Sequence, residues 1–263
     1  ADRRVFAIAP LVVLVSTFLL YIVVPAGPRL VVQDLDVGIF YALAVSSLSV
    51  IGVLMAGWAS ANKFALLGSL RAAGQLIAYE LPLVLAVVGV VIQANTMSLQ
   101  GIVHAQADGA IFGFDLIGNP FILTQIVGFG IFLAAAQAEL TQTPFDMPVA
   151  ESELVAGYMT EYSGFRFLFF FMAEFGTAFA LSAIAATLYM GGWSLPGVDG
   201  TFADILGPFV LGAKVMLVAF LIFWIRFTFP RFREDQLQAF AWKILIPLSL
   251  VNIMATAAFK VFV

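Results

Sequence analysis

The amino-acid sequence predicts an all-α polytopic membrane protein with about seven transmembrane helices and a cytoplasmic N-terminus. Three observations predict this fold. Of the 263 residues, 62% are hydrophobic and only 11% are charged, whereas a soluble domain carries about a quarter charged residues. Apolar stretches of roughly 20 residues, long enough to cross a bilayer, recur along the chain. Basic residues fall at the start and in alternate loops. We expect residues 1–263 to form a single transmembrane domain.

Proline and glycine mark most ends of the expected helices. The first helix follows "ADRR" and stops before "PAGP" at 25–28. No small-residue cleavage site follows its apolar run, so we interpret it as a spanning helix and not as a signal peptide. Asn119–Pro120, "MGGWSLPG" at 190–197 and Gly207–Pro208 mark later ends. In order, the expected spans are 5–24, 38–58, 72–94, 120–141, 165–190, 208–229 and 239–262.

The orientation follows from the positive-inside rule. One side of the predicted membrane carries only Arg29 and Lys260, with Lys214 a few residues inside a helix. The other basic residues fall on the opposite, cytoplasmic side: Arg3, Arg4, Lys63, Arg71, Arg166, Arg226, Arg231 and Arg233.

An acidic segment, "AELTQTPFDMPVAESELVAGYMTEYSG" at 138–164, joins the fourth and fifth expected spans on this same cytoplasmic face. It contains no basic residue. Its carboxylates are Glu139, Asp146, Glu151, Glu153 and Glu161. Two ordinary interpretations stay open: Asp146 caps a following helix, and Glu151 and Glu153 lie near the positive end of that helix.

Two further carboxylates lie inside apolar spans. Counted along a helix, Glu80 lies about 13 Å beyond Arg71 and Glu174 about 12 Å beyond Arg166, while Glu139 lies near the cytoplasmic end of its own span. Intramembrane carboxylates usually face a bundle interior or a wet cavity. Two of them about 6 Å apart repel by roughly 3 kcal/mol, so such a set shares protons, as a proton relay requires. Alternatively, Glu80 lies at the interface if its helix begins at Leu81–Pro82.

The residue types argue against a redox centre or metal site on this chain alone. There is no cysteine and only one histidine, His104, whereas iron–sulfur clusters need several thiolates. Neither a glycine-rich phosphate loop nor a metal-ligand cluster occurs. The net charge of −4 comes from separate loops and intramembrane acids, so nucleic-acid binding is not indicated.

Other segments allow structural interpretations. "SANKFALLGSLRAAGQLIAYE" at 60–80 leads from a loop into a helix, and its polar residues either line a cavity or anchor the helix. "RFTFPRFREDQLQAF" at 226–240 either anchors at the headgroups or docks a soluble partner. We expect Arg71 and Arg166 to form ion pairs with some of the acids, and His104 to be exposed in a polar loop.

Four long motifs occur in order along essentially the whole chain: "DLDVGIFYALAVSS", "SANKFALLGSLRAAGQLIAYE", "TPFDMPVAESELVAGYMTEYSGFRFLFFFMAEF" and "RFTFPRFREDQLQAFAWKILIPLSLVN". They closely resemble the H-type membrane subunit of respiratory complex I, the proton-translocating NADH:quinone oxidoreductase. The resemblance implies a multi-pass protein of a prokaryotic plasma membrane. It also implies a subunit that forms part of the quinone chamber and has no complete activity alone.

The resemblance further implies partners and site residues. Soluble iron–sulfur and quinone-site subunits, carrying FMN and Fe–S clusters in the peripheral arm, would meet this chain, as would small and antiporter-like membrane subunits. Quinone would be the substrate at the subunit interface, and this chain would hold no cofactor itself. The implied proton-relay residues are Glu80, Glu139, Asp146, Glu151, Glu153, Glu161 and Glu174. The implied quinone-chamber or partner-docking residues are Arg71, Arg166, Arg231, Arg233 and Asp235.

Two departures from the family pattern stand out. Val149 occupies a position where the family commonly has a further acid, which puts in doubt any role that needs that acid. The family's additional N-terminal helix and basic amphipathic segment do not precede "ADRR", so the sequence looks like an N-terminal truncation.

Other functions remain open from the sequence. One is the equivalent subunit of a membrane-bound hydrogenase or of a dehydrogenase with another electron donor. A second is a stand-alone proton- or cation-coupled transporter that uses the same acids. A third is a scaffold, whose acids could be neutralised without loss of coupling.

Overall fold

The computed structural model describes residues 2–108, 119–149, 151–195 and 201–262. Within these ranges all regular structure is helical, which confirms the predicted all-α class. In chain order the helices are α1 (Arg3–Tyr21), α2 (Gly38–Ala59), α3 (Lys63–Ala94), α4 (Leu99–Ala107), α5 (Ile126–Glu139), α6 (Glu151–Leu154), η1 (Gly157–Met159), α7 (Phe165–Tyr189), α8 (Thr201–Thr228), α9 (Glu234–Phe240), the π-helical η2 (Ala241–Leu245) and α10 (Ile246–Phe262).

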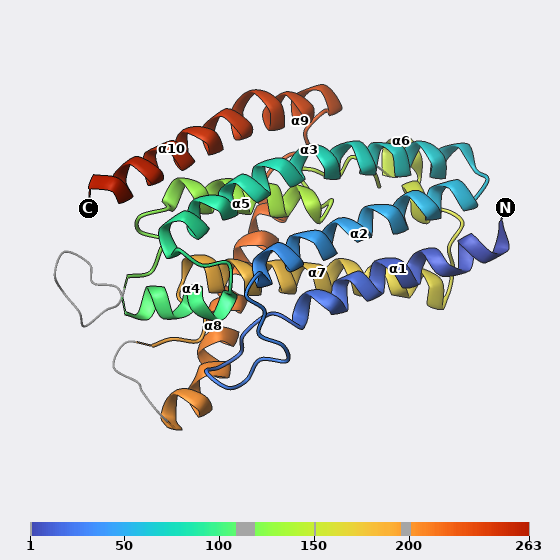
Figure 1. Ribbon diagram of the computed structural model, residues 1–263. Coiled ribbons are helices and arrows are strands. Elements are labelled where there is room, and N and C mark those ends of the chain that lie inside the picture. The colour runs from blue at the N-terminus through green and yellow to red at the C-terminus, as the bar shows by residue number, and fades with distance from the viewer. Residues whose placement is uncertain (1, 109–118, 150, 196–200, 263) are drawn as a thin grey trace.

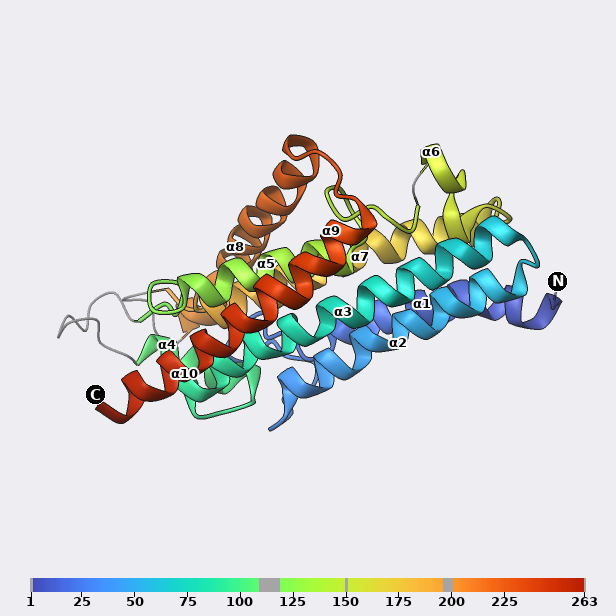
Figure 2. The same ribbon diagram turned by 90° about the horizontal axis from the view of Figure 1, so that it is seen from above.

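The long helices run side by side as an elongated bundle (Figure 1). Helix α3 is central, since it packs against α2, α5 and α10, and α1 packs against α2 and α7. Helix α8 contacts α7 and then leans away from the bundle, as Figure 2 shows from above. In both views the two termini lie at opposite ends of the bundle.

Six helices in the described ranges are long and apolar enough to cross a membrane. They correspond to every expected span except the fourth, 120–141. There the structure has the 14-residue helix α5, which is about 21 Å long and so shorter than the roughly 30 Å hydrocarbon core. Termini at opposite ends agree with an odd number of crossings, but the count of seven stays a prediction.

Several expected boundaries and loops were wrong. Helix α3 begins at Lys63 and not near residue 72, because Asn62 caps it by accepting a hydrogen bond from the backbone N–H of Phe64. Pro82 lies inside α3, so the alternative in which a helix starts at Leu81–Pro82 is also wrong. The predicted polar loop around His104 is helix α4, capped by Ser98, although His104 itself is exposed.

Small residues allow the helices to approach closely, as is common between membrane helices. A Cβ atom at Gly57 of α2 would overlap the Ser69 hydroxyl of α3 and lie 2.7 Å from the Ala65 carbonyl oxygen. Glycine therefore sets the contact that joins α2 to α3 at their cytoplasmic ends.

Candidate functional site

The first part of the site joins α2, α3 and α5 through Glu139. This residue is the last of α5. The Ser46 hydroxyl of α2 and the Glu80 carboxylate of α3 both interact with its carboxyl group. The tertiary structure therefore brings together two of the predicted acids that are 59 positions apart in the sequence.

Gln75 fixes the end of α5 against α3. Its side chain is fully buried, and its Nε2 donates to the carbonyl oxygens of Ala138, at 2.7 Å, and Phe145, at 2.8 Å. One amide thus ties the residue before Glu139 to the acidic segment that follows. The Ala138 oxygen also accepts from the Thr141 backbone N–H at 3.1 Å, whereas Gln75 is the donor found for the Phe145 oxygen in the described residues, so Gln75 helps to fix the local path of the chain.

The second part of the site surrounds Glu174 of α7. Its Oε1 accepts a hydrogen bond from Gln142 Nε2 at 2.9 Å and lies 3.7 Å from Arg226 Nη1 of α8. The Glu174 side chain is 26% exposed. An intramembrane carboxylate thus has a neutral donor and a cation as partners, which is the pairing that makes burial of such a group tolerable.

Tyr158 of η1 lies near enough to Glu174 and Asp146 to be affected by both charges. Burial, followed by the negative charges of Glu174 and Asp146, raises the pKa of the Tyr158 phenol, which keeps it a neutral hydrogen-bonding group. The tyrosine is positioned because η1 crosses α3 closely: a Cβ at Gly68 would lie 2.7 Å from the Cα of Gly157. Gly157 also adopts φ of +55°, which glycine tolerates best.

Asp146 does not cap a helix. No helix starts directly after it, since α6 begins only at Glu151, so the capping interpretation was wrong. Glu153 pairs with Arg71. The contacts therefore favour this ion pair over an interaction of Glu153 with the positive end of α6, which has only 4 residues.

Arg71 of α3 is the centre of a third, cytoplasmic part of the site. Its Nη1 lies 2.7 Å from Glu153 Oε2, and its Nε lies 3.6 Å from Glu234 Oε2 at the start of α9. The expected ion pairing of Arg71 is therefore present. The hydrogen bond from Arg71, more than any other cause, holds the pKa of Glu153 below its usual value of 4.5.

A polar cavity of about 440 Å³ opens beside this ion pair. We call it the Arg71 cavity. It is lined by Arg71, Met147, Glu153, Arg231, Phe232, Arg233, Glu234 and Asp235. Four of the five predicted docking residues therefore lie around one opening: Arg71, Arg231, Arg233 and Asp235. Arg233 and Asp235 also pair with each other at 3.4 Å.

The remaining predicted residues lie at the edge of these groups. Glu161 accepts a hydrogen bond from Asn62 Nδ2 at 2.6 Å. The expected ion pair of Arg166 is not found among the described residues, and its guanidinium lies 5.5 Å from the centre of the Phe6 ring instead. The side chain of Glu151 falls outside the described part of the chain.

Buried oxygen atoms without a hydrogen-bond partner cluster near the end of α5. Within the described residues they are Gln75 Oε1, Gln137 Oε1, Glu139 Oε2 and Gln142 Oε1. Buried acceptors of this kind normally find a donor. A protonated carboxyl group or an ordered water is a donor that fits between such oxygens.

Sequence reasoning missed Ser46, Gln142 and Tyr158, which touch the predicted acids. Gln142 had a usable signal, because it is a polar amide inside the acidic segment. Ser46 had none, since serine is common in membrane helices.

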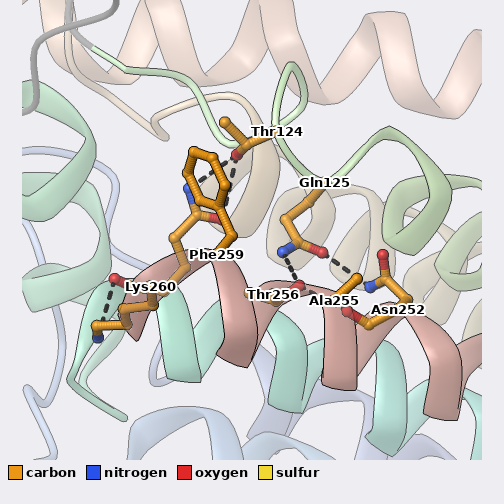
Figure 3. Close-up of a pocket in the computed structure, with 8 residues that line it drawn as sticks. Thr124, Gln125, Asn252, Ala255, Thr256, Phe259 and Lys260 are labelled. Atoms are coloured by element: carbon orange, nitrogen blue, oxygen red, sulfur yellow. Dashed lines mark hydrogen bonds between the residues drawn. The ribbon is translucent and has the colours of Figure 1, made fainter. Parts of the chain in front are cut away.

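A separate polar cluster lies at the other end of the bundle, between α5 and α10 (Figure 3). Gln125 accepts from Asn252 Nδ2 at 2.8 Å and donates to Thr256 Oγ1 at 2.6 Å. Lys260 donates to the carbonyl oxygen of Ile92 and to Asn95 Oδ1. These hydrogen bonds hold α10 against α5 and the end of α3, and the Lys260 ammonium is held by neutral oxygens.

No group of three or more His, Cys, Asp or Glu side chains arranged to hold a metal ion occurs in the parts of the chain that are described. The carboxylates are spread along the bundle and paired with amides and arginines. This arrangement is suited to binding and passing protons and to ionic contact with a partner.

Comparison with known proteins agrees with this geometry. The NADH dehydrogenase family profile matches residues 1–257. The H-type subunit of NADH-quinone oxidoreductase from Dehalococcoides mccartyi (strain CBDB1) is 46% identical over 257 residues, covering 98% of this chain and 68% of the relative. The H-type subunit from Geobacillus kaustophilus (strain HTA426) is 47% identical over 260 residues, covering 99% of this chain and 74% of the relative.

A further relative, an H-type subunit of NADH-quinone oxidoreductase from Syntrophobacter fumaroxidans (strain DSM 10017 / MPOB), is 47% identical over 268 residues, covering 98% of this chain and 76% of the relative. These relatives are bacterial, and several apolar helices make this chain a multi-pass protein of the plasma membrane. A family profile that spans nearly all of the sequence, with relatives so similar over their shared length, shows that this chain belongs to the NADH dehydrogenase family.

Proposed function

We propose that this chain is the H-type membrane subunit of a proton-translocating NADH:quinone oxidoreductase, which forms part of the quinone chamber and couples quinone reduction to proton translocation. The chain acts as one component of that enzyme and has no complete activity alone. The observation that carries the proposal is the series of acids from Glu153 through Asp146 and Glu174 to Glu139 and Glu80. The names of the relatives favour this enzyme over the hydrogenase branch and over a stand-alone transporter.

The relay would begin at the cytoplasmic acidic segment. Tyr158 interacts with both Asp146 and Glu174, so a change in the charge of one acid alters the field at the other. Arg226 lies 3.7 Å from the Glu174 carboxylate, and Gln142 holds that carboxylate in one orientation. Glu161 would extend this acidic face toward the partners.

The next step would run from Glu174 toward Glu139. Gln142 and Gln137 offer buried acceptor oxygens between the acidic segment and the end of α5. Protons move between carboxylic acids through donors and acceptors of this kind when the groups lie in a polar interior. The charge of Glu80 on α3 acts on Glu139 at the end of α5, so a change in the charge of one acid affects the other.

The partners would dock at the Arg71 cavity. Arg231, Arg233 and Asp235 are exposed there, and charged rims of this kind recognise oppositely charged partner surfaces. We assign this face, with Arg166 at its edge, to the soluble iron–sulfur and quinone-site subunits that carry FMN and the clusters. The sides of the bundle would meet the small and antiporter-like membrane subunits.

Neutralising two acids in the assembled enzyme tests the relay. Glu174→Gln and Glu153→Gln keep the shape of each side chain and remove its charge. We expect quinone-linked proton pumping in membrane vesicles to fall by about a hundredfold, the lower end of the effect of a lost proton-transfer group, while the enzyme still assembles. Asp36→Asn changes an exposed acid on the opposite side of the membrane and serves as the matched control.

The ratio of protons pumped to NADH oxidised is the decisive measurement. Normal pumping in both variants, at normal assembly, would defeat the assignment and favour the scaffold function. Purification from native membranes without a co-purifying iron–sulfur protein would favour the stand-alone transporter.

A further inference from the structure

A cavity of about 480 Å³ lies between the segment after α1 and helices α7 and α8. It opens where α8 begins and where α1 ends at Tyr21, whose hydroxyl donates to the Gly176 carbonyl oxygen midway along α7. Its walls are mostly apolar and include Val31, Phe179, Leu211 and Val215. A cavity of this composition excludes water and accepts hydrocarbon.

The depth of the cavity fits one leaflet of the membrane. Phe179, at its inner end, lies about 15 Å along α7 from the outer end at Tyr189. Half of the hydrocarbon core is also about 15 Å thick. A single acyl chain that starts at the outer headgroups would therefore reach the bottom of the cavity.

A cation stands at the mouth of this cavity. Arg29 lines it, and its side chain is 89% exposed. In the described ranges its only charged partner is Asp204, whose Oδ2 lies 3.9 Å from Arg29 Nε, and it makes no hydrogen bond there. Lys260 and Lys214, the other basic residues on this side, differ because their ammonium groups already donate to neutral oxygens, among them those of Asn95 and Gly192.

An exposed guanidinium with unused donors binds a phosphate group well, since two parallel N–H groups meet two phosphate oxygens. We propose that this cavity is a binding site for an anionic phospholipid of the outer leaflet. One acyl chain lies between α7 and α8, and the phosphate lies against the Arg29 guanidinium. The contact with Asp204 is long, so the phosphate competes with it without breaking a short ion pair. This site is independent of the proposed proton relay.

Photolabelling of the assembled enzyme tests the site. The probe is phosphatidylglycerol with a diazirine near the end of one acyl chain, incorporated into membranes that contain the enzyme. We expect labelled peptides from residues 179–183 of α7 and 208–215 of α8. Arg29→Gln should reduce this labelling about fivefold, the effect of one basic residue near an anionic lipid surface, and Arg29→Lys should restore most of it.

A second pair of variants fills the cavity without touching Arg29. Gly212 lines the cavity, and a Cβ there would meet nothing within 4 Å, so Gly212→Leu places its side chain in free space. Gly130 of α5 has equally open surroundings but does not line this cavity. We expect Gly212→Leu to abolish the labelling at 179–183 and Gly130→Leu to leave it unchanged.

Three results would overturn the proposal. Equal labelling by the phosphatidylcholine analogue would show that Arg29 selects no anionic headgroup. Unchanged labelling in Gly212→Leu would place the lipid outside the cavity. Loss of the label on addition of quinone would make an isoprenoid tail the occupant. Labelling is read without measuring turnover, so failure here leaves the proton relay unaffected.

Discussion

Replacing Gln75 by leucine tests whether one buried amide holds the acidic segment onto α3. The Gln75 Nε2 donates at 2.7 Å to the Ala138 oxygen and at 2.8 Å to the Phe145 oxygen. Leucine has a similar volume and no donor. The Phe145 carbonyl then loses its donor, at about 1–3 kcal/mol. The Ala138 carbonyl keeps the hydrogen bond from the Thr141 backbone N–H and loses only about 0.5–1.5 kcal/mol.

The same substitution also removes one unfavourable group, which offsets part of the lost stability. The Gln75 Oε1 has no partner among the described residues, and leucine removes this unsatisfied oxygen, which relieves about 1–3 kcal/mol. The net loss of local stability is therefore about 0.5–1.5 kcal/mol, the balance of the two weakened carbonyl contacts and one relieved oxygen. Since about 1.4 kcal/mol corresponds to a tenfold change in an equilibrium, the segment should open several-fold to roughly tenfold more often.

Hydrogen exchange of the assembled enzyme measures this opening. The informative amides are those of Leu140, Thr141 and Phe145, which hydrogen-bond within the segment to Ala136, Ala138 and Gln142, respectively. Their exchange should accelerate several-fold to about tenfold in Gln75→Leu, in line with that loss of stability. Because Glu139 follows Ala138 directly, proton pumping should fall in the same variant.

Gln106→Leu is the matched control. Gln106 is also a buried glutamine whose Nε2 donates to backbone oxygens, among them those of Thr187 and Leu188, but at the opposite end of the bundle. Its variant should accelerate exchange at the end of α7 and leave residues 140–145 unchanged. If Gln75→Leu assembles normally and exchange at 140–145 stays at the wild-type rate, the argument that Gln75 holds this segment is wrong.

Three further predictions concern other contacts. Gly57→Leu should reduce the stability of the fold by about 1–3 kcal/mol, because the new side chain overpacks against Ser69. The thermal half-life of the enzyme should be shorter, and an unchanged half-life would refute the close contact. Arg71 lowers the pKa of Glu153, so their ion pair stabilises the segment above the usual pKa of 4.5, and this stabilisation is lost as the pH falls below that value. Protection of residues 151–154 from proteolysis should fall over the same pH range. In Arg71→Gln the protection should no longer depend on pH. Lys214→Met removes two hydrogen bonds, of 2.8 and 2.9 Å, to the turn after α7. Amide exchange in that turn should accelerate about tenfold. Exchange at the wild-type rate would show that the lysine does not hold the turn.

The sequence determined the fold class. Apolar length decides which segments can cross a bilayer, so α1, α2, α7 and α8 were predicted with at least one end nearly correct, while the orientation inferred from the basic loops stays a prediction. Long apolar segments need no tertiary partner to be recognised. Helix α5 was misjudged in length because Asn119–Pro120 begins a turn segment and the helix itself begins only at Ile126.

The sequence also identified most of the acids, because a carboxylate among apolar residues is costly and therefore conspicuous. It could not tell which of them meet. That Glu139 interacts with Glu80, that Glu174 lies near Arg226 and that Glu153 pairs with Arg71 depend on helices far apart in the chain coming together. Partners across a bundle leave no periodic signal along the sequence, so only the tertiary structure decides them.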